Sequence, residues 1–118
     1  RTGIDETNFR LWNNKANAFG WASYLGQAPG ADSVPLNSVP ARVEDLTGLA
    51  PAWTGVGDCD LFHDEDLAYA ERLRAAGVPC DVDVVGGAFH GFDALAAKAP
   101  VVRSFNQAKV SALEAALA

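Results

Sequence analysis

The sequence predicts an α/β fold in which the chain forms the closing strand–helix–strand–helix part of a doubly wound, mostly parallel sheet. Two short apolar runs, 52–57 and 80–85, have the length of strands, and an amphipathic stretch at 65–76 separates them. A second helical stretch follows at 101–118. Strands connected by a helix pair in parallel through a right-handed crossover. Because two parallel strands need further neighbours and cover on both faces, we expect the chain to be part of a larger domain.

The first predicted helix lies in an aromatic segment, residues 8–26. Its apolar stripe has helical spacing and consists of Phe9, Trp12, Ala16 and Phe19. Gly20 is expected to end this helix, after which a short second turn extends the apolar surface through Trp21, Tyr24 and Leu25. Residues 27–51 contain several prolines and a Pro-Gly pair, which predict a linker with at most one helical turn at 42–46.

The helix between the two strands has predicted capping residues at both ends. Asp64 is expected to be its N-cap, and acidic residues fill its first turn. Gly77 suits the position after the C-cap, and Pro79 prevents continuation. The last helix, 101–118, has four large apolar residues on its predicted inner face: Phe105, Val110, Leu113 and Leu117.

The composition excludes several classes of protein. Hydrophobic residues make up 49% and charged residues 20%, as in an ordinary globular protein. A net charge of −6 disfavours nucleic-acid binding, and no run approaches the ~20 apolar residues of a membrane span. The start at Arg1 suggests a chain that begins partway through a gene product, and a cytoplasmic location is favoured. Cys59 and Cys80 are predicted to be free thiols, because they fall at opposite strand ends.

Polar side chains follow both predicted strands at their carboxyl ends, where parallel sheets bind ligands. Asp60 follows the first strand and His90 the second, so both are expected at one edge of the sheet. A carboxylate beside an imidazole is the orienting half of a hydrolase triad, and the order acid before histidine is that of α/β-hydrolases. Asp58 is expected to point the other way, as a solvated loop carboxylate. No metal site is expected, although the acidic and histidine residues are dense here: Asp58, Asp60, His63, Asp64 and His90.

The chain resembles the hormone-sensitive-lipase-like carboxylesterases of the α/β-hydrolase class, along nearly its whole length. Residues 56–65 (VGDCDLFHDE) are similar to the acid segment of that family, and residues 69–78 (YAERLRAAGV) to the helix that follows. Residues 87–92 (GAFHGF) resemble its histidine segment, and residues 40–49 (PARVEDLTGL) its approach to the strand. Residues 12–26 look like the helix that joins its cap. Gly86 and Ala50 stand where family members often have proline.

The resemblance implies a C-terminal part of a serine carboxylic-ester hydrolase that acts on short or medium acyl esters. Residues 1–38 would be a cap-associated helix and linker, and residues 39–118 an incomplete catalytic domain. Asp60 would be the triad acid and His90 the base, with no cofactor. The chain has no Gly-x-Ser-x-Gly or His-Gly-Gly motif, and Ser23 lacks the spacing of such a motif. The nucleophile and oxyanion hole would therefore lie in an N-terminal remainder, and the chain alone is expected to be inactive.

Aromatic residues near the predicted site are candidates for substrate contact. Phe62 or Phe92 could line an acyl pocket, whereas Phe89 is expected in the core. Trp12 and Trp21, with Tyr24, would either contact substrate or bury the cap against the sheet. Two other functions stay open: a non-catalytic binding protein or receptor of this fold, and a prolyl-oligopeptidase-type peptidase. The sequence leaves the oligomeric state open.

Overall fold

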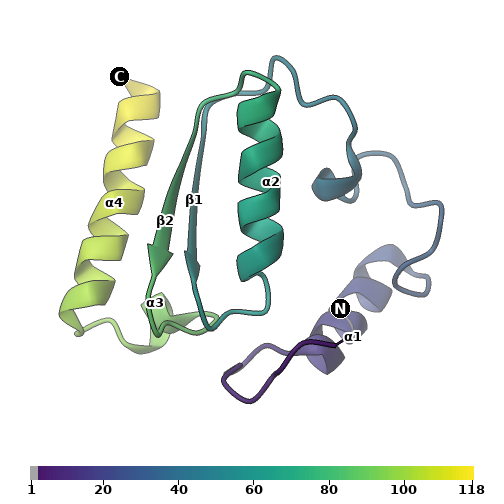
Figure 1. The fold of residues 1–118 in the computed structure, drawn as a ribbon, viewed down its shortest axis with the longest axis horizontal. Helices are drawn as coiled ribbons and strands as arrows, with labels where there is room; N and C mark the ends of the chain where they lie inside the picture. Colours follow the sequence, from purple (N-terminus) through teal and green to yellow (C-terminus); the bar gives the residue numbers. More distant parts are fainter. Residues whose placement is uncertain (1–2) are drawn as a thin grey trace.

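Two parallel strands form the centre of the structure, a computed structural model that describes residues 3–118. β1 (Ala52–Gly57) and β2 (Cys80–Val85) pair along their full length, from Ala52 opposite Cys80 to Gly57 opposite Val85. α2 (His63–Ala75) joins the strands on one face, and α4 (Pro100–Leu117) covers the other (Figure 1). The predicted α/β class, the order of these elements and both strand ranges are confirmed.

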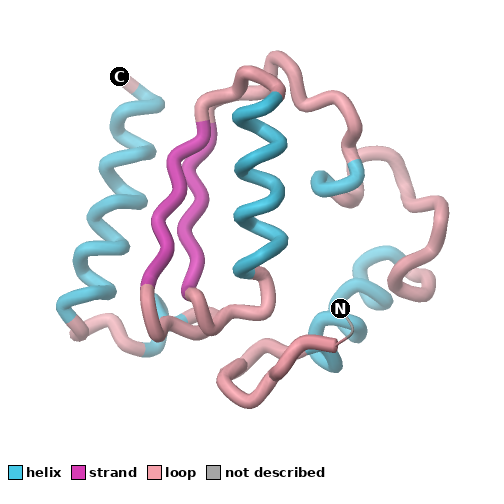
Figure 2. The backbone as a smooth tube through the Cα atoms, viewed as in Figure 1, coloured by secondary structure: helices cyan, strands magenta, loops and turns pink. Residues whose placement is uncertain are grey.

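Three shorter elements complete the chain. α1 (Asn14–Leu25) lies near the edge of the sheet where both strands end, and a loop interrupted by a 3-10 turn at Pro40–Arg42 leads from it to β1 (Figure 2). α3 (Phe92–Leu95) is a single turn between β2 and α4, which the sequence did not predict. A four-residue helix has almost no periodic signal of its own, so the sequence could not indicate it.

The core has one cluster on each side of the sheet. Against α2 the buried residues are Leu46, Ala70, Leu73, Val78 and Cys80. Against α4 they are Val85, Ala88, Phe92, Val102 and Phe105. The helices therefore hold the two strands between them, and their ends fix where the loops after β1 and β2 emerge.

The first helix differs from its prediction at both ends. It begins at Asn14, because the Asn13 side chain accepts a hydrogen bond from the Ala16 backbone N–H at 2.9 Å and caps the helix. It runs through Gly20 and ends at Gly26, which adopts the left-handed conformation with φ 65°. The prediction that Gly20 ends the helix was wrong. A glycine inside a helix costs only about 1 kcal/mol, and better-placed caps outweigh that cost.

The helix between the strands also starts earlier than predicted. It begins at His63, so Asp64 lies inside the first turn and is not the N-cap. The N-cap position is Phe62, whose backbone N–H donates to Asp60 Oδ1 at 2.9 Å. Gly77, with φ 80°, follows the C-cap as predicted. Asp60 therefore helps to organise the turn that leads into α2.

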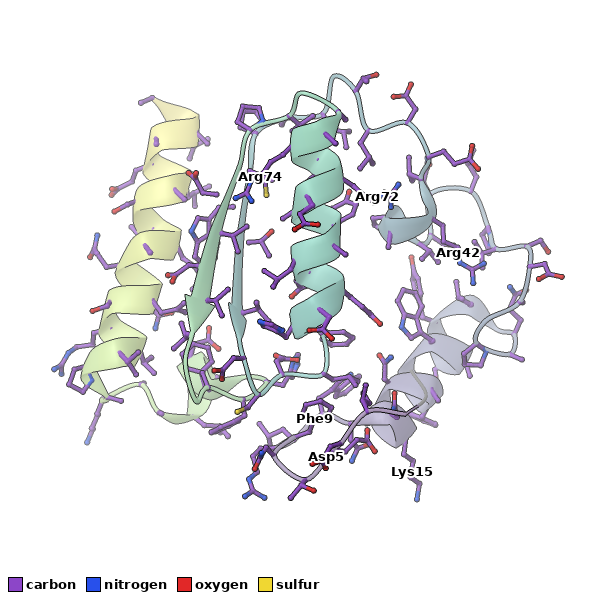
Figure 3. All side chains as sticks on the ribbon, in the orientation of Figure 1. Asp5, Phe9, Lys15, Arg42, Arg72 and Arg74 are labelled. Atoms are coloured by element: carbon purple, nitrogen blue, oxygen red, sulfur yellow. The ribbon has the colours of Figure 1, made fainter. Side chains whose placement is uncertain are left out.

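The linker is fastened to α2 by Arg72. Its guanidinium donates to the Ala41 carbonyl oxygen at 2.6 Å and also to the Val43 carbonyl oxygen. Figure 3 shows this side chain between α2 and the 3-10 turn. The predicted helical turn at 42–46 was misplaced, because the ordered turn is Pro40–Arg42. Proline at the start of a turn supplies a suitable φ and needs no donor.

The last helix buries only part of its predicted apolar face. Phe105 is buried, but Val110, Leu113 and Leu117 are exposed. Among residues 3–118, no helix has both the length and the apolar character needed to cross a membrane.

Candidate active site

The loops after the two strands are bonded directly to one another. The Asp58 backbone N–H donates to the Val85 carbonyl oxygen at 3.1 Å, and the Cys59 N–H donates to the Ala88 carbonyl oxygen at 3.0 Å. Gly57 permits this approach, because a Cβ built there would lie 2.1 Å from the Ala88 oxygen. The glycine thus brings the two loops close enough for their side chains to meet.

Asp60 and His90 are in hydrogen-bond contact at this edge of the sheet. Asp60 Oδ2 lies 3.0 Å from His90 Nδ1. Asp60 is buried (9% exposed), whereas the His90 side chain is 38% exposed. Since an ionised carboxylate only accepts hydrogen bonds, Nδ1 donates, and the basic lone pair of the neutral ring is on Nε2. This arrangement can take a proton from a hydroxyl group placed beside Nε2.

Both carboxylate oxygens of Asp60 have hydrogen-bond partners. Oδ1 accepts the Phe62 backbone N–H at 2.9 Å, and Oδ2 contacts the imidazole. The backbone bond fixes the carboxylate in one rotation, so Oδ2 remains directed at Nδ1. Among the described residues, no buried side-chain nitrogen or oxygen atom lacks a hydrogen-bond partner.

Asp58 does not compete for the histidine. It is exposed, as expected from the sequence, but its Oδ1 also accepts the Gly87 backbone N–H at 2.7 Å. Asp58 therefore ties the loop after β1 to the loop after β2. The two cysteines, Cys59 and Cys80, are free thiols as predicted.

Two aromatic rings flank the imidazole. The Trp12 and Phe62 ring centroids lie 5.7 Å and 5.5 Å from that of His90, with interplanar angles of 32° and 69°. Trp12 belongs to the segment before α1, so the N-terminal part of the chain reaches the Asp60–His90 pair. Rings at these distances and angles make favourable contacts.

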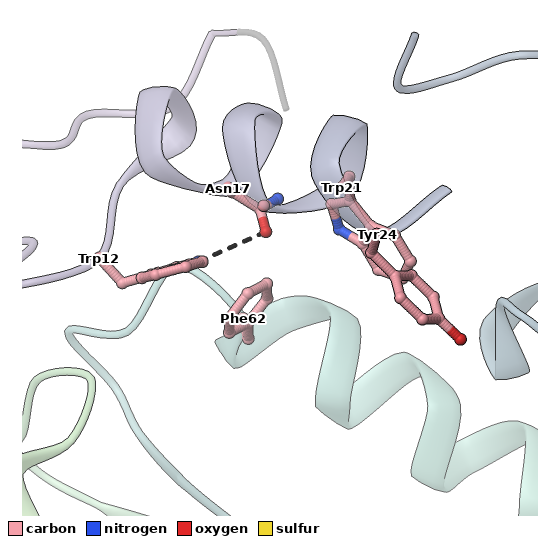
Figure 4. Close-up of a pocket in the computed structure, with 6 residues that line it drawn as sticks. Trp12, Asn17, Trp21, Tyr24 and Phe62 are labelled. Carbon is pink, nitrogen blue, oxygen red and sulfur yellow. Dashed lines mark hydrogen bonds between the residues drawn. The ribbon is translucent and has the colours of Figure 1, made fainter. Parts of the chain in front are cut away.

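A cavity of about 230 Å³ lies between α1 and the start of α2 (Figure 4). Its lining residues are Trp12, Asn17, Gly20, Trp21, Tyr24 and Phe62. Trp12 Nε1 donates to Asn17 Oδ1 at 3.3 Å, which fixes the indole against the helix. Three of the four predicted substrate-contact residues therefore line this one cavity: Trp12, Trp21 and Phe62.

The fourth, Phe92, is a core residue as well as a lining residue. It is 7% exposed, and its ring centroid lies 4.9 Å from that of Phe105. It also borders a second cavity of about 320 Å³, which includes Asp60 and His90 in its wall. Phe89, predicted for the core, packs against the same cluster on the α4 side.

A charged pair in the wall of the second cavity joins α3 to α4. Lys109 Nζ lies 2.6 Å from Asp93 Oδ2 and 5.2 Å from the centre of the Phe105 ring. The hydrogen bond from Lys109 holds the pKa of Asp93 below its usual value. Asp93 follows His90 by three residues, so this pair steadies the end of the histidine loop.

Asp66 is a site residue whose role the sequence did not reveal. The sequence suggested only a favourable charge in the first turn of α2, but Asp66 lies in the wall of the second cavity with Asp60 and His90. Burial, and next the negative charge of Asp60, raise the pKa of Asp66 to about 6. The sequence showed only that Asp66 follows Asp60 by six residues. The burial that raises its pKa depends on how α2 packs against the rest of the fold.

We expect Asp66 to make the stability of the fold depend on pH. The pKa of Asp66 is about 6 in the folded chain against an ordinary value of 3.8, so the folded state binds the proton more tightly. Stability should therefore fall as pH rises from about 4 to 6, and the cost stays in place above that range. Because Asp66 is about half buried, we expect Asp66→Asn to stabilise the chain at pH 7.5 by only about 1 kcal/mol. Urea unfolding at several pH values measures the difference.

The matched control is Glu71→Gln, on the exposed side of the same helix. Its effect on the free energy of unfolding should not change between pH 4 and pH 7.5. An Asp66→Asn variant whose advantage is equally large at pH 4 would contradict the titration, because the native carboxyl is already protonated there.

The described residues form no group of three or more His, Cys, Asp or Glu side chains suited to a metal ion. His63, the other histidine, pairs with Asp64, whose Oδ1 lies 2.8 Å from His63 Nδ1. The Ser23 hydroxyl donates to the Phe19 carbonyl oxygen at 2.8 Å within α1.

Comparisons with known proteins agree with this architecture. The model of the family described as alpha/beta hydrolase fold matches residues 2–94. Esterase LipI of Mycobacterium tuberculosis is 32% identical over 83 residues, which are 70% of this chain and 26% of that protein. Lipase 2 of Moraxella sp. is 39% identical over 82 residues, 70% of this chain and 18% of that protein.

Solved structures of esterases contain the same fold. Esterase LipW from Mycobacterium marinum is 32% identical and superposes with a TM-score of 0.84, over 99% of this chain and 37% of that one. A bacterial heroin esterase is 31% identical with a TM-score of 0.82, over 92% of this chain and 35% of that one. The matched part of this chain thus spans only about a third of these structures, and 26% and 18% of the two curated relatives. With residues 2–94 matching its model, the chain belongs to the alpha/beta hydrolase fold family.

Proposed function

We propose that the protein carrying this chain is a serine carboxylic-ester hydrolase, in which Asp60 is the triad acid and His90 the base. The observation that carries the proposal is the 3.0 Å contact between Asp60 Oδ2 and His90 Nδ1 at the carboxyl edge of the sheet. The names of similar proteins support it, since they include an esterase and a lipase. We propose esters of short or medium acyl chains as substrates.

In the proposed reaction, a serine outside this chain attacks the ester carbonyl carbon. His90 Nε2 takes the hydroxyl proton and then gives it to the leaving alcohol oxygen, and water repeats the cycle on the acyl-enzyme. Asp60 keeps the proton on Nδ1 and stabilises the imidazolium ion. Backbone N–H groups, also outside this chain, would hold the oxyanion.

Within this proposal, residues 39–118 are part of the catalytic domain and residues 1–38 are a cap-associated helix and linker. The contacts of Trp12 with His90 support a cap segment that closes over the site. Trp12, Trp21, Phe62 and Phe92 would face the substrate, with Phe92 contributing from the core. The partner of this chain is then the N-terminal remainder of the same hydrolase.

The test uses the protein that joins this chain to its nucleophile segment. It should hydrolyse p-nitrophenyl esters, with rates that decline from short to long acyl chains, and should react with a serine-directed fluorophosphonate. The 118-residue chain alone should remain unlabelled. A joined protein that cleaves peptide anilides but no ester would favour a peptidase, and one that cleaves neither would favour a binding protein.

A further inference from the structure

We infer that Lys109 and Asp93 are positioning residues of the proposed reaction, which hold the histidine loop from α4 so that the His90 imidazole stays beside the triad acid. The inference deepens the proposed function and rests on it where it concerns the rate of ester hydrolysis. The hold on the loop itself can be measured without any catalysis.

The two ends of the histidine loop are held by different parts of the fold. At its beginning, the Gly87 backbone N–H donates to Asp58 Oδ1 at 2.7 Å. The carbonyl oxygen of the next residue, Ala88, accepts a hydrogen bond from the loop after β1 at 3.0 Å. At its end, the loop passes into α3 through Gly91, which has the left-handed conformation with φ 72°. Because a one-turn helix has little stability of its own, this end of the loop depends on what α3 packs against.

α3 lies beside α4 at the carboxyl edge of the sheet (Figure 1) and contacts it through two neighbouring residues. The ring centroids of Phe92 and Phe105 lie 4.9 Å apart. Asp93 Oδ2 lies 2.6 Å from Lys109 Nζ, which is also 5.2 Å from the centre of the Phe105 ring. Phe105 and Lys109 are four residues apart and therefore share one face of α4. These four residues, which we call the α3–α4 contact, restrain both the position and the rotation of α3.

The charged half of the α3–α4 contact gives it direction. A hydrogen bond between an ammonium and a carboxylate is short and strong, whereas two packed rings tolerate sliding. The hydrogen bond from Lys109 holds the pKa of Asp93 below its usual value, so the two groups stay charged across the neutral range. Both residues also border the cavity of about 320 Å³ whose wall contains Asp60 and His90. A shift of α3 therefore reaches the acid–base pair within three residues of chain.

This ion pair should affect the rate of the reaction more than the stability of the fold. The Lys109 and Asp93 side chains are 40% and 30% exposed, and ion pairs that water reaches contribute little to folding. A displacement of about 1 Å in a reacting group, however, is enough to lower a rate by about a hundredfold. The two effects can therefore be separated by experiment.

The experiment compares Lys109→Met with Lys109→Arg in the protein that joins this chain to its nucleophile segment. Methionine keeps an unbranched side chain near Phe105 and removes the charge, whereas arginine keeps a cationic donor for Asp93. Lys109→Met should lower kcat at least about tenfold with KM nearly unchanged, because a displaced imidazole impairs proton transfer and not ester binding. Lys109→Arg should recover most of this loss, to within about threefold of the original kcat.

Lys98→Met is the matched control for the change in charge. Lys98 is exposed, precedes α4 and lies outside the α3–α4 contact, so kcat should stay within about twofold. Asp93→Ala should lower kcat as much as Lys109→Met does, and the double variant should lose no more than either single variant. Losses that multiply to about a hundredfold would mean that the two residues act independently, which would overturn the inference.

Urea unfolding checks that the loss of rate is not a loss of fold. The midpoint for Lys109→Met should move by no more than about 0.5 M. A much larger shift, with kcat restored when the protein is assayed well below the transition, would assign the ion pair to folding and overturn the positioning role.

The hold on the loop is measured in the 118-residue chain through the His90 Nδ1–H proton. This proton lies between Nδ1 and Asp60 Oδ2, which are 3.0 Å apart, and its exchange with water reports how often the contact opens. Exchange should be at least about tenfold faster in Lys109→Met and unchanged in Lys98→Met. Equal exchange in these two variants, or an unchanged kcat in Lys109→Met, would overturn the inference. If the joined protein cleaves no ester while the difference in exchange remains, the proposed function fails and the α3–α4 contact still positions the histidine.

Discussion

Replacing His90 with alanine in the protein that joins this chain to its nucleophile segment is expected to lower kcat for ester hydrolysis at least about a thousandfold. The imidazole contacts Asp60 Oδ2 through Nδ1, has a second ring nitrogen that is free to act as a base, and belongs to a side chain that is 38% exposed. Without it, the attacking hydroxyl has no acceptor for its proton and the leaving alcohol has no donor. The KM should change little, because the ester is bound chiefly by surrounding side chains.

His63→Ala is a matched control for this prediction. His63 also contacts a carboxylate through Nδ1, Asp64 Oδ1 at 2.8 Å, and is similarly accessible, with its side chain 25% exposed. It lies at the start of α2 and lines neither of the two cavities described above. Its replacement should leave kcat within about twofold. Comparable losses in both variants would mean that the two histidines matter for folding and that His90 has no special role.

The strands could be predicted from the sequence because local signals bound them on both sides. Pro51 and Pro79 precede the two runs, and Gly57 and Gly86 lie where the runs end. Turn residues of this kind act through the backbone and do not depend on distant contacts. The same locality explains why the ends of the strands, and with them the edge carrying Asp60 and His90, were found.

Helix ends were predicted less well, because several residues could serve as caps. Gly20 and Gly26 are both plausible ends of α1, and the helix continues to Gly26, which adopts the left-handed conformation. Trp12 covers Gly20 from outside the helix, with ring atoms 3.4 Å and 3.6 Å from the position of a Cβ. Asp64 was similarly a reasonable cap by type, but the Asp60 side chain already organises that turn. At Gly20 a side chain from outside the helix is in contact, whereas at Asp64 a competing local bond, from the Phe62 N–H to Asp60 two residues earlier, sets the start of the helix.

The surroundings of the site were less accessible to sequence reasoning than its two polar residues. Phe92 and Phe62 are equally apolar neighbours of the pair, yet Phe92 packs into the core and Phe62 contacts the imidazole. Asp66 has the composition of a surface residue, and its raised pKa results from burial beside Asp60. Each of these outcomes depends on how the helices and the loops after the two strands pack together, which no local pattern specifies.

Replacing Asp60 with asparagine is expected to invert the tautomer of His90 and to lower kcat by about 10³ to 10⁴-fold. The asparagine oxygen can still accept the Phe62 N–H, as Asp60 Oδ1 does now at 2.9 Å. The amide NH₂ group then faces His90 Nδ1 in place of Oδ2. A donor in that position requires Nδ1 to accept, so the ring proton moves to Nε2. The nitrogen that should take the hydroxyl proton is then already protonated.

The tautomer can be measured in the 118-residue chain itself, because it has only two histidines. With neutral rings, the ¹⁵N shift of His90 Nδ1 should change from the protonated to the unprotonated range in Asp60→Asn. Asp64→Asn provides the control: it alters the partner of His63 and should leave the His90 signals and kcat unchanged. A rate loss without a change of tautomer would assign Asp60 a purely structural part in the turn before α2. An unchanged rate would remove it from the triad, because no other acceptor among the described residues is seen to contact His90 Nδ1 and Asp58 is held by Gly87.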